Sequence, residues 1–124
     1  MAKVLVIDDE HNFRTILEMV LRSHGYDVLL ADSGTTGLSI YQREHPAVVV
    51  LDLKMPGMDG IAVFQEIRHE NPKQSVIVLS GDSSPETEGR VRALGVSEFI
   101  VKGLSMHVLT DTLKRLLASL SHAA

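Results

Sequence analysis

The chain has 124 residues, of which 44% are hydrophobic and 23% charged, as in an ordinary globular domain with its own core. The 12 basic and 16 acidic residues give a net charge of −4, which argues against nucleic-acid binding by this domain. Cysteine is absent, so disulfides and thiolate sites are excluded. The start lacks a signal-peptide pattern, and no apolar run reaches membrane-spanning length. We therefore expect one cytoplasmic domain over residues 1–124, without membrane contact.

Five short apolar runs, rich in β-branched residues, recur along the chain. They occupy residues 4–7, 28–30, 48–51, 76–79 and 99–101. Each run is nearly continuous rather than alternating, which predicts strands that are buried on both faces.

Segments with helical spacing separate and follow these runs. The first helical stripe consists of Phe13, Ile16, Leu17, Val20 and Leu21. The last consists of Met106, Leu109, Leu113, Leu116, Leu117 and Leu120. Both stripes are predicted to face the core.

Capping residues mark the ends of these helices. Gly25 and Gly95 are suited to a left-handed residue just after a helix. The predicted N-caps are Asp59, Ser105 and, in a capping box with Glu86, Ser83. Strand and helix thus alternate five times, which predicts an α/β fold with a parallel sheet and helices on both faces.

The fourth helix, in SPETEGRVRALG, has few residues to bury. Val91, Ala93 and Leu94 are its apolar residues, and Gly89 in its middle costs about 1 kcal/mol relative to alanine. We expect either the loosest helix of the fold or an ordinary solvated surface helix.

Charged and hydroxyl side chains follow four of the predicted strands. Asp8, Asp9 and Glu10 follow the first, Asp52 the third, Ser80 the fourth and Lys102 the fifth. Sites in open parallel sheets form at the carboxyl ends of the strands, so Asp8, Asp9 and Asp52 are expected to converge if the first, third and fourth strands are neighbours. Carboxylates so close together either take up protons or hold a cation, and an all-oxygen site favours Mg²⁺ over zinc.

These residues carry a resemblance to a known family. The acidic pair Asp8-Asp9, the stretch DLKMPGMDG over residues 52–60, Ser80, Phe99 and Lys102 together resemble the receiver domains of two-component response regulators, such as the single-domain chemotaxis regulators. The resemblance covers essentially the whole chain. It implies a flavodoxin-like, doubly wound (βα)5 fold with a five-stranded parallel sheet in the order 2-1-3-4-5.

The resemblance also implies a function. Asp52 would accept a phosphoryl group from a sensor histidine kinase or phosphotransfer protein, assisted by Lys102 and Ser80, so that the chain catalyses only its own phosphorylation and dephosphorylation. Mg²⁺ would be held by Asp8, Asp9, Asp52 and the backbone carbonyl of Lys54. Pro56 would shape the following turn.

Movement of Ser80 and Phe99 would then switch a face made by the fourth helix, fifth strand and fifth helix. The downstream protein partner is not indicated, and phosphorylation-dependent dimerisation is left open.

One departure from the family pattern lies at Gly103, where the family usually has proline after a cis peptide bond. With glycine at this position, the sequence does not indicate how firmly the Lys102 side chain is oriented towards the site.

Four other interpretations compete with this one. A haloacid-dehalogenase-type phosphatase needs a second Asp where this chain has Lys54, and a flavodoxin needs a phosphate loop where it has DDEHN. Two interpretations stay open. The chain could be a receiver-like docking module that is never phosphorylated, or the receiver fragment of a larger regulator.

Overall fold

The computed structural model describes residues 2–55, 57–81, 84–103 and 106–122, over which five strands and five helices alternate. The elements are β1 (Lys3–Ile7), α1 (His11–Ser23), β2 (Asp27–Ala31), α2 (Gly34–Glu44), β3 (Val48–Asp52), α3 (Gly60–Glu70), β4 (Ser75–Ser80), α4 (Pro85–Ala93), β5 (Glu98–Val101) and α5 (Met106–His122). Each predicted apolar run lies within one strand, which confirms the predicted alternation.

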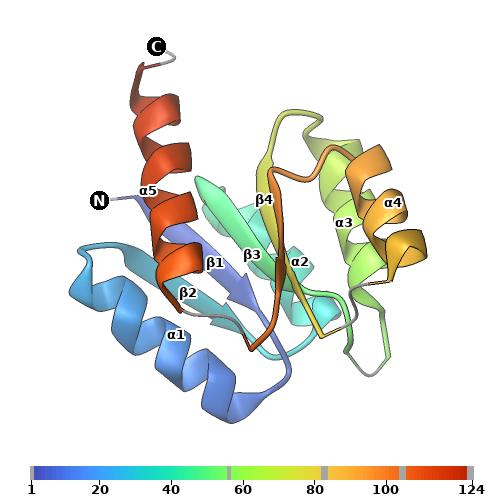
Figure 1. The fold of residues 1–124 in the computed structure, drawn as a ribbon, viewed down its shortest axis with the longest axis horizontal. Helices are drawn as coiled ribbons and strands as arrows, with labels where there is room; N and C mark the ends of the chain where they lie inside the picture. The colour runs from blue at the N-terminus through green and yellow to red at the C-terminus, as the bar shows by residue number, and fades with distance from the viewer. Residues whose placement is uncertain (1, 56, 82–83, 104–105, 123–124) are drawn as a thin grey trace.

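The strands form one parallel sheet in the order β2-β1-β3-β4-β5, as predicted (Figure 1). Its register aligns the strand ends: Ile7 pairs with Leu51, Asp52 with Leu79, and Ser80 with Val101. The residues that follow β1, β3, β4 and β5 therefore meet at one edge of the sheet.

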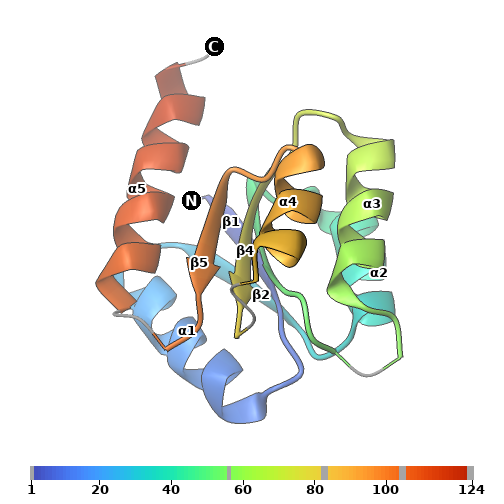
Figure 2. The same ribbon diagram turned by 45° about the vertical axis from the view of Figure 1, so that its right-hand side comes forward.

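Helices cover both faces of the sheet, with α1 and α5 on one side and α2, α3 and α4 on the other (Figures 1 and 2). Successive residues of each strand point to opposite faces of the sheet. Leu5 and Val49 pack towards Phe64 of α3, whereas Val4 and Val48 pack towards Leu17 of α1. The two cores together bury the sheet.

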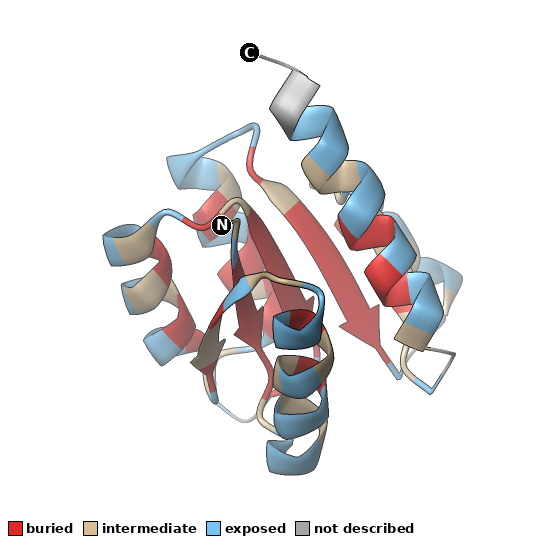
Figure 3. Ribbon diagram, turned by 90° about the vertical axis from the view of Figure 1, so that its left-hand side faces the viewer, coloured by how far each residue is buried: buried red, intermediate tan, exposed pale blue. Residues whose placement is uncertain are grey.

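The strands are buried and the outward faces of the helices are exposed (Figure 3). Most residues of the two predicted helical stripes are buried or half-buried, but two are not. Ile16 is 47% exposed and Leu120 is 42% exposed, so the prediction that these two face the core is wrong. The buried face of each of these two helices is therefore narrower than the distribution of its apolar residues predicts.

Most helix ends follow the predicted signals. Gly25 and Gly95 have the left-handed φ angles of +88° and +79°. The Asp59 side chain accepts a hydrogen bond from Ala62 N at 2.9 Å. The N-cap of helix α4 is Ser84, which accepts from Thr87 N at 3.3 Å, so the cap lies one residue later than predicted.

Three positions with predicted roles, Pro56, Ser83 and Ser105, lie outside the described residues.

Helix α4 is the least buried helix on its face of the sheet. Val91 is its single buried residue, whereas α3 beside it buries Gly60, Ile61, Val63, Phe64 and Ile67. This contrast agrees with the expectation of a weakly anchored fourth helix.

Within the described parts of the chain, no helix has both the length and the apolar character needed to span a membrane.

Candidate functional site

The ends of β1, β3 and β5 bring the predicted charged residues together. Asp52 is the last residue of β3, and Asp8 follows β1 directly, with its N–H donating to Ala31 O at 3.0 Å. Lys102 follows β5, and its N–H donates to Ser80 O at 2.7 Å. Because backbone pairing continues through these residues, the sheet itself fixes where their side chains begin.

The Lys102 ammonium lies among three carboxylates. Its Nζ is 2.6 Å from Glu10 Oε1, 3.0 Å from Asp8 Oδ2 and 3.2 Å from Asp52 Oδ2. The Lys102 side chain is 14% exposed, and those of Asp8 and Asp52 are 1% and 4% exposed. We call these four residues the acid pocket.

Hydrogen bonds leave part of this pocket unsatisfied. Asp8 Oδ1 accepts from Glu10 N at 2.8 Å, and Asp52 Oδ1 accepts from Lys54 N at 3.2 Å. Asp8 Oδ2 is buried and, although within ion-pair distance of Lys102, accepts no hydrogen bond from any described residue. Its charge is therefore balanced by the Lys102 ammonium alone among the described residues, and a metal ion would be a further suitable partner for it.

The pKa values in the pocket reflect this crowding. Burial, followed by the nearby charge of Asp8, raises the pKa of Asp52 from 3.8 to about 6, against the opposing influence of Lys102. For Lys102, burial lowers the pKa, but the close contacts of its ammonium with Glu10 and Asp8 and the nearby carboxylate charges outweigh it, so the pKa is raised. Lys102 is therefore a permanent cation, and the ionised form of Asp52 is held at an energetic cost.

The carboxylates are close enough to share one metal ion. Oxygen atoms of Asp8, Glu10 and Asp52 all lie within 4.8 Å of one another. Three carboxylates this close together, whose charge one ammonium does not balance, form an all-oxygen donor set of the kind that Mg²⁺ takes.

Two of the predicted Mg²⁺ ligands stand outside this group. Asp9 is half-buried and does not belong to the cluster, so its role stays a prediction, as does that of the Lys54 carbonyl. Glu10 was not predicted as a site residue. The sequence feature that could have identified Glu10 is its position as the third consecutive acidic residue after β1.

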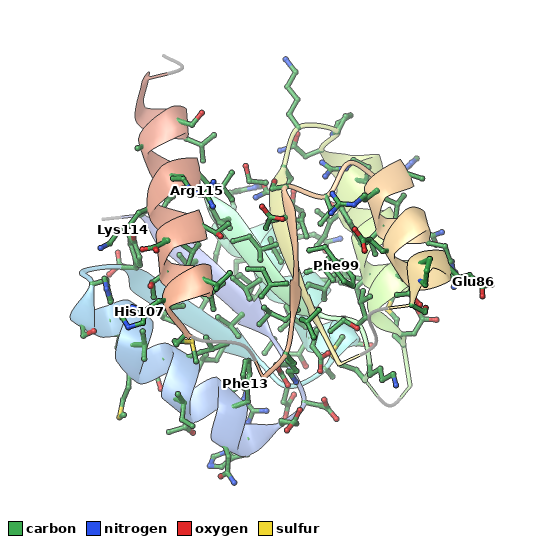
Figure 4. The ribbon with its side chains drawn as sticks, in the orientation of Figure 1. Phe13, Glu86, Phe99, His107, Lys114 and Arg115 are labelled. Atoms are coloured by element: carbon green, nitrogen blue, oxygen red, sulfur yellow. The ribbon has the colours of Figure 1, made fainter. Side chains whose placement is uncertain are left out.

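Ser80 lies on the α4 side of the pocket. It is fully buried at the end of β4 and lines a hollow of about 180 Å³ together with Lys54, Asp59, Thr87 and Arg90. Phe99 of β5 is half-buried and packs with the core beneath α3 and α4, towards which it points in Figure 4. Ser80 and Phe99, the two predicted switch residues, therefore both lie next to helix α4.

Phe13 of α1 is a second residue beside Lys102 that was not predicted as part of the site, because its helical spacing indicates a core residue. Its ring centroid lies 4.6 Å from Lys102 Nζ, and Figure 4 shows it near the end of β5. Gly103, next to Lys102, has a φ of +97°, and no peptide bond between described residues is cis. The loop after β5 is therefore built differently from the pattern with cis-proline.

The family model described as "Response regulator receiver domain" matches residues 4–114. The probable transcriptional regulator ycf27 of Porphyridium aerugineum is 42% identical over 122 residues, which are 98% of this chain and 50% of that protein. The chain thus spans about half the length of this curated relative.

Solved structures agree with the fold. The response regulator TrrA of Thermotoga maritima, in complex with Mg²⁺ and BeF, has a TM-score of 0.85 and 31% identity, over 94% of this chain and 99% of that one. A CheY-like receiver domain of Methanospirillum hungatei has a TM-score of 0.95 at 22% identity, over 100% of this chain and 99% of that one, and supports the fold alone.

Proposed function

The chain belongs to the response regulator receiver domain family, and from this premise we propose that Asp52 accepts a phosphoryl group. The observation that carries the proposal is the acid pocket: Asp52 ends a buried strand with Lys102 Nζ 3.2 Å from its Oδ2. A carboxylate held at an energetic cost beside a permanent cation is suited to attack phosphorus. Receiver domains are signalling phosphoacceptors rather than conventional enzymes, and this chain would act only on itself.

The chemistry requires positive charge in place before the reaction. An Asp52 oxygen forms a bond to phosphorus as the P–N bond of a phosphohistidine, or the P–O bond of an acyl phosphate, breaks and the leaving group keeps the electron pair. Lys102 faces the developing charge on the phosphoryl oxygens from the β5 side. Ser80, at the end of β4, supplies a hydroxyl from the other side.

Mg²⁺ would be held by Asp8 and Asp52, with Glu10 in reach and Asp9 and the Lys54 carbonyl as further predicted ligands. When bound, it neutralises charge on the phosphoryl oxygens. Asp8 is suited to this role because it is a buried carboxylate, 1% exposed, within the same cluster as Asp52.

We further propose that phosphorylation is transmitted through Ser80 and Phe99 to α4, β5 and α5. What supports this is the single buried residue of α4, which makes its displacement inexpensive. The face would bind a downstream protein, or a second copy of the chain when phosphorylated. A switched element of this kind needs only a small energy gap between its two positions.

The phosphodonor would be a sensor histidine kinase or a phosphotransfer protein. Residues 1–124 would form a single receiver domain, either alone or as part of a larger regulator, since the curated relative is about twice as long. The cytoplasmic location and the absence of nucleic-acid binding by this domain stay predictions from composition.

Intact mass spectrometry after incubation with Mg²⁺ and acetyl phosphate tests the proposal. We expect a gain of one phosphoryl group in the native chain and none in Asp52→Asn. If the native chain gains nothing and also fails to bind beryllofluoride with Mg²⁺, it is a docking module that works without phosphorylation. If Asp52→Asn gains the group equally, Asp52 is not the acceptor.

A further inference from the structure

We propose that Phe13 is a positioning residue for Lys102, with its aromatic face holding the ammonium in the acid pocket. Lys102 Nζ lies 4.6 Å from the centroid of the Phe13 ring, well within the distance at which a cation is attracted to an aromatic face. The inference deepens the proposed function, on which it rests, because it concerns how the cation beside Asp52 is aimed.

The ring and the carboxylates approach the same ammonium from different parts of the chain. Glu10, Asp8 and Asp52 lie within 3.2 Å of Nζ, and Phe13 comes from the first turn of α1. The Lys102 side chain is only 14% exposed, so the attraction operates where little water screens it.

The ring itself is held in place by packing. Phe13 is half-buried against the core of α1 and α5. Together with Lys102, Gly103, Met106 and Leu109 it borders a hollow of about 20 Å³, which has room for about one water molecule. The ring therefore has little freedom to turn away from Lys102.

The loop after Lys102 explains why such a support is useful in this chain. Gly103 follows directly and adopts a φ of +97°, a conformation that glycine enters freely. A glycine at this point leaves the backbone intrinsically pliable, so contacts of the Lys102 side chain must contribute to its aim. Phe13 is the one described aromatic residue in cation–π contact with Lys102.

Two sets of variants separate attraction to the ring from simple packing. Mono-, di- and trifluorinated phenylalanine at position 13 weaken the attraction stepwise while hardly changing the shape of the ring. Phe13→Leu removes it, and Phe13→Trp retains it. Ile16→Ala, an exposed position on the same helix, is the matched control for changes to α1.

The first readout does not need phosphorylation. NMR of chain labelled with ¹³Cε-lysine, with Lys102 identified by Lys102→Arg, reports the ring current of Phe13 on the Lys102 Hε protons. We expect these protons upfield of other lysines, an upfield position lost in Phe13→Leu and retained in Ile16→Ala. The second readout is the rate of phosphorylation by acetyl phosphate at saturating Mg²⁺. We expect a stepwise fall with fluorination, reaching about five-fold in Phe13→Leu, and rescue by Phe13→Trp.

Each outcome gives a decision. Lys102 Hε protons without a Phe13-dependent shift, or phosphorylation rates that do not change along the fluorinated series, would overturn the inference. A fall in thermal stability of Phe13→Leu with an unchanged rate would assign the ring to packing alone. Failure of the native chain both to take up phosphoryl groups and to bind beryllofluoride with Mg²⁺ would instead refute the proposed function, and is seen before any variant is made.

Discussion

The acid pocket and helix α4 border the same end of the sheet but are held in opposite ways. In the pocket, two carboxylates that are at most 4% exposed surround one ammonium, so every change of charge meets strong interactions. Helix α4 buries only Val91. Its C-terminal end is tied down by Arg68 of α3, which donates to Leu94 O at 2.7 Å and Gly95 O at 3.1 Å. Strong electrostatic interactions are therefore concentrated in the acid pocket, whereas displacing the N-terminal part of α4 costs the least free energy.

The largest effect is expected from removing the cation of the pocket. Lys102→Met leaves Asp8 and Asp52 buried without their counter-charge, and we expect the free energy of unfolding to fall by about 3 kcal/mol at pH 7.5 in EDTA. Urea denaturation measures it. Lys73→Met, at an exposed lysine, is the control and should change stability by less than about 0.5 kcal/mol. Equal effects of the two substitutions would show that the pocket stores little energy.

Removing the charge of Asp52 should have the opposite sign. Its folded-state pKa, about 6, lies above the ordinary 3.8, so the folded protein binds the proton more tightly and loses stability as the pH rises from about 4 to about 6. Above that window the penalty is complete, at roughly 3 kcal/mol. In EDTA, Asp52→Asn should therefore be more stable than the native chain at pH 7.5 and not at pH 4.

Thermal unfolding across this pH range checks the sign. A constant difference between Asp52→Asn and the native chain at all pH values would mean that the carboxylate is not strained. Saturating Mg²⁺ should stabilise the native chain and reduce the advantage of the variant at pH 7.5, because a ligand bound only by the folded state stabilises it.

The tie between α3 and the end of α4 is the next test. Arg68 donates five hydrogen bonds to backbone carbonyls, so Arg68→Met should cost about 2 kcal/mol and speed amide exchange in α4. Arg92→Met is the matched control, since it removes an exposed pair with Glu88 worth about 0.5 kcal/mol. Unchanged exchange in α4 after Arg68→Met would show that other contacts anchor that helix.

The smallest effect should come from stiffening α4 itself. A methyl group at Gly89 would meet no described atom within 4 Å, so Gly89→Ala should raise the free energy of unfolding by about 0.5–1 kcal/mol through helix propensity. Gly37→Ala is the matched control in α2, because its methyl would lie 2.6 Å from Ile7 Cδ1 and should destabilise the protein. Destabilisation by Gly89→Ala would mean that α4 is packed more tightly than its burial indicates.

Much of this architecture could be predicted from the sequence. The continuous apolar runs identify strands buried on both faces, and the parallel alternation brings Asp8, Asp52 and Lys102 to one edge. The order of the strands required the family resemblance, because several orders satisfy the same local pattern.

The contacts that sequence reasoning missed depend on side-chain direction. Glu10 and Phe13 reach Lys102 because Glu10 is the N-cap of α1 and Phe13 lies in its first turn, which follows Asp8 within a few residues. An apolar residue such as Phe13 in a helical stripe is predicted as core, and nothing in its spacing separates packing from contact with an ammonium. Ile16 was placed in the core for the same reason, since helical spacing does not show where the buried stripe ends.

Hydrogen exchange in α4 tests most directly whether a change in the acid pocket is expressed in that helix. Amide exchange of residues 85–93 and 60–70 is compared with and without Mg²⁺ and beryllofluoride, which mimics the phosphoryl group, with Asp52→Asn as the control. We predict a change in residues 85–93 and none in residues 60–70, and no change in Asp52→Asn. Exchange that is unaltered in α4, or altered equally in α3, would contradict it.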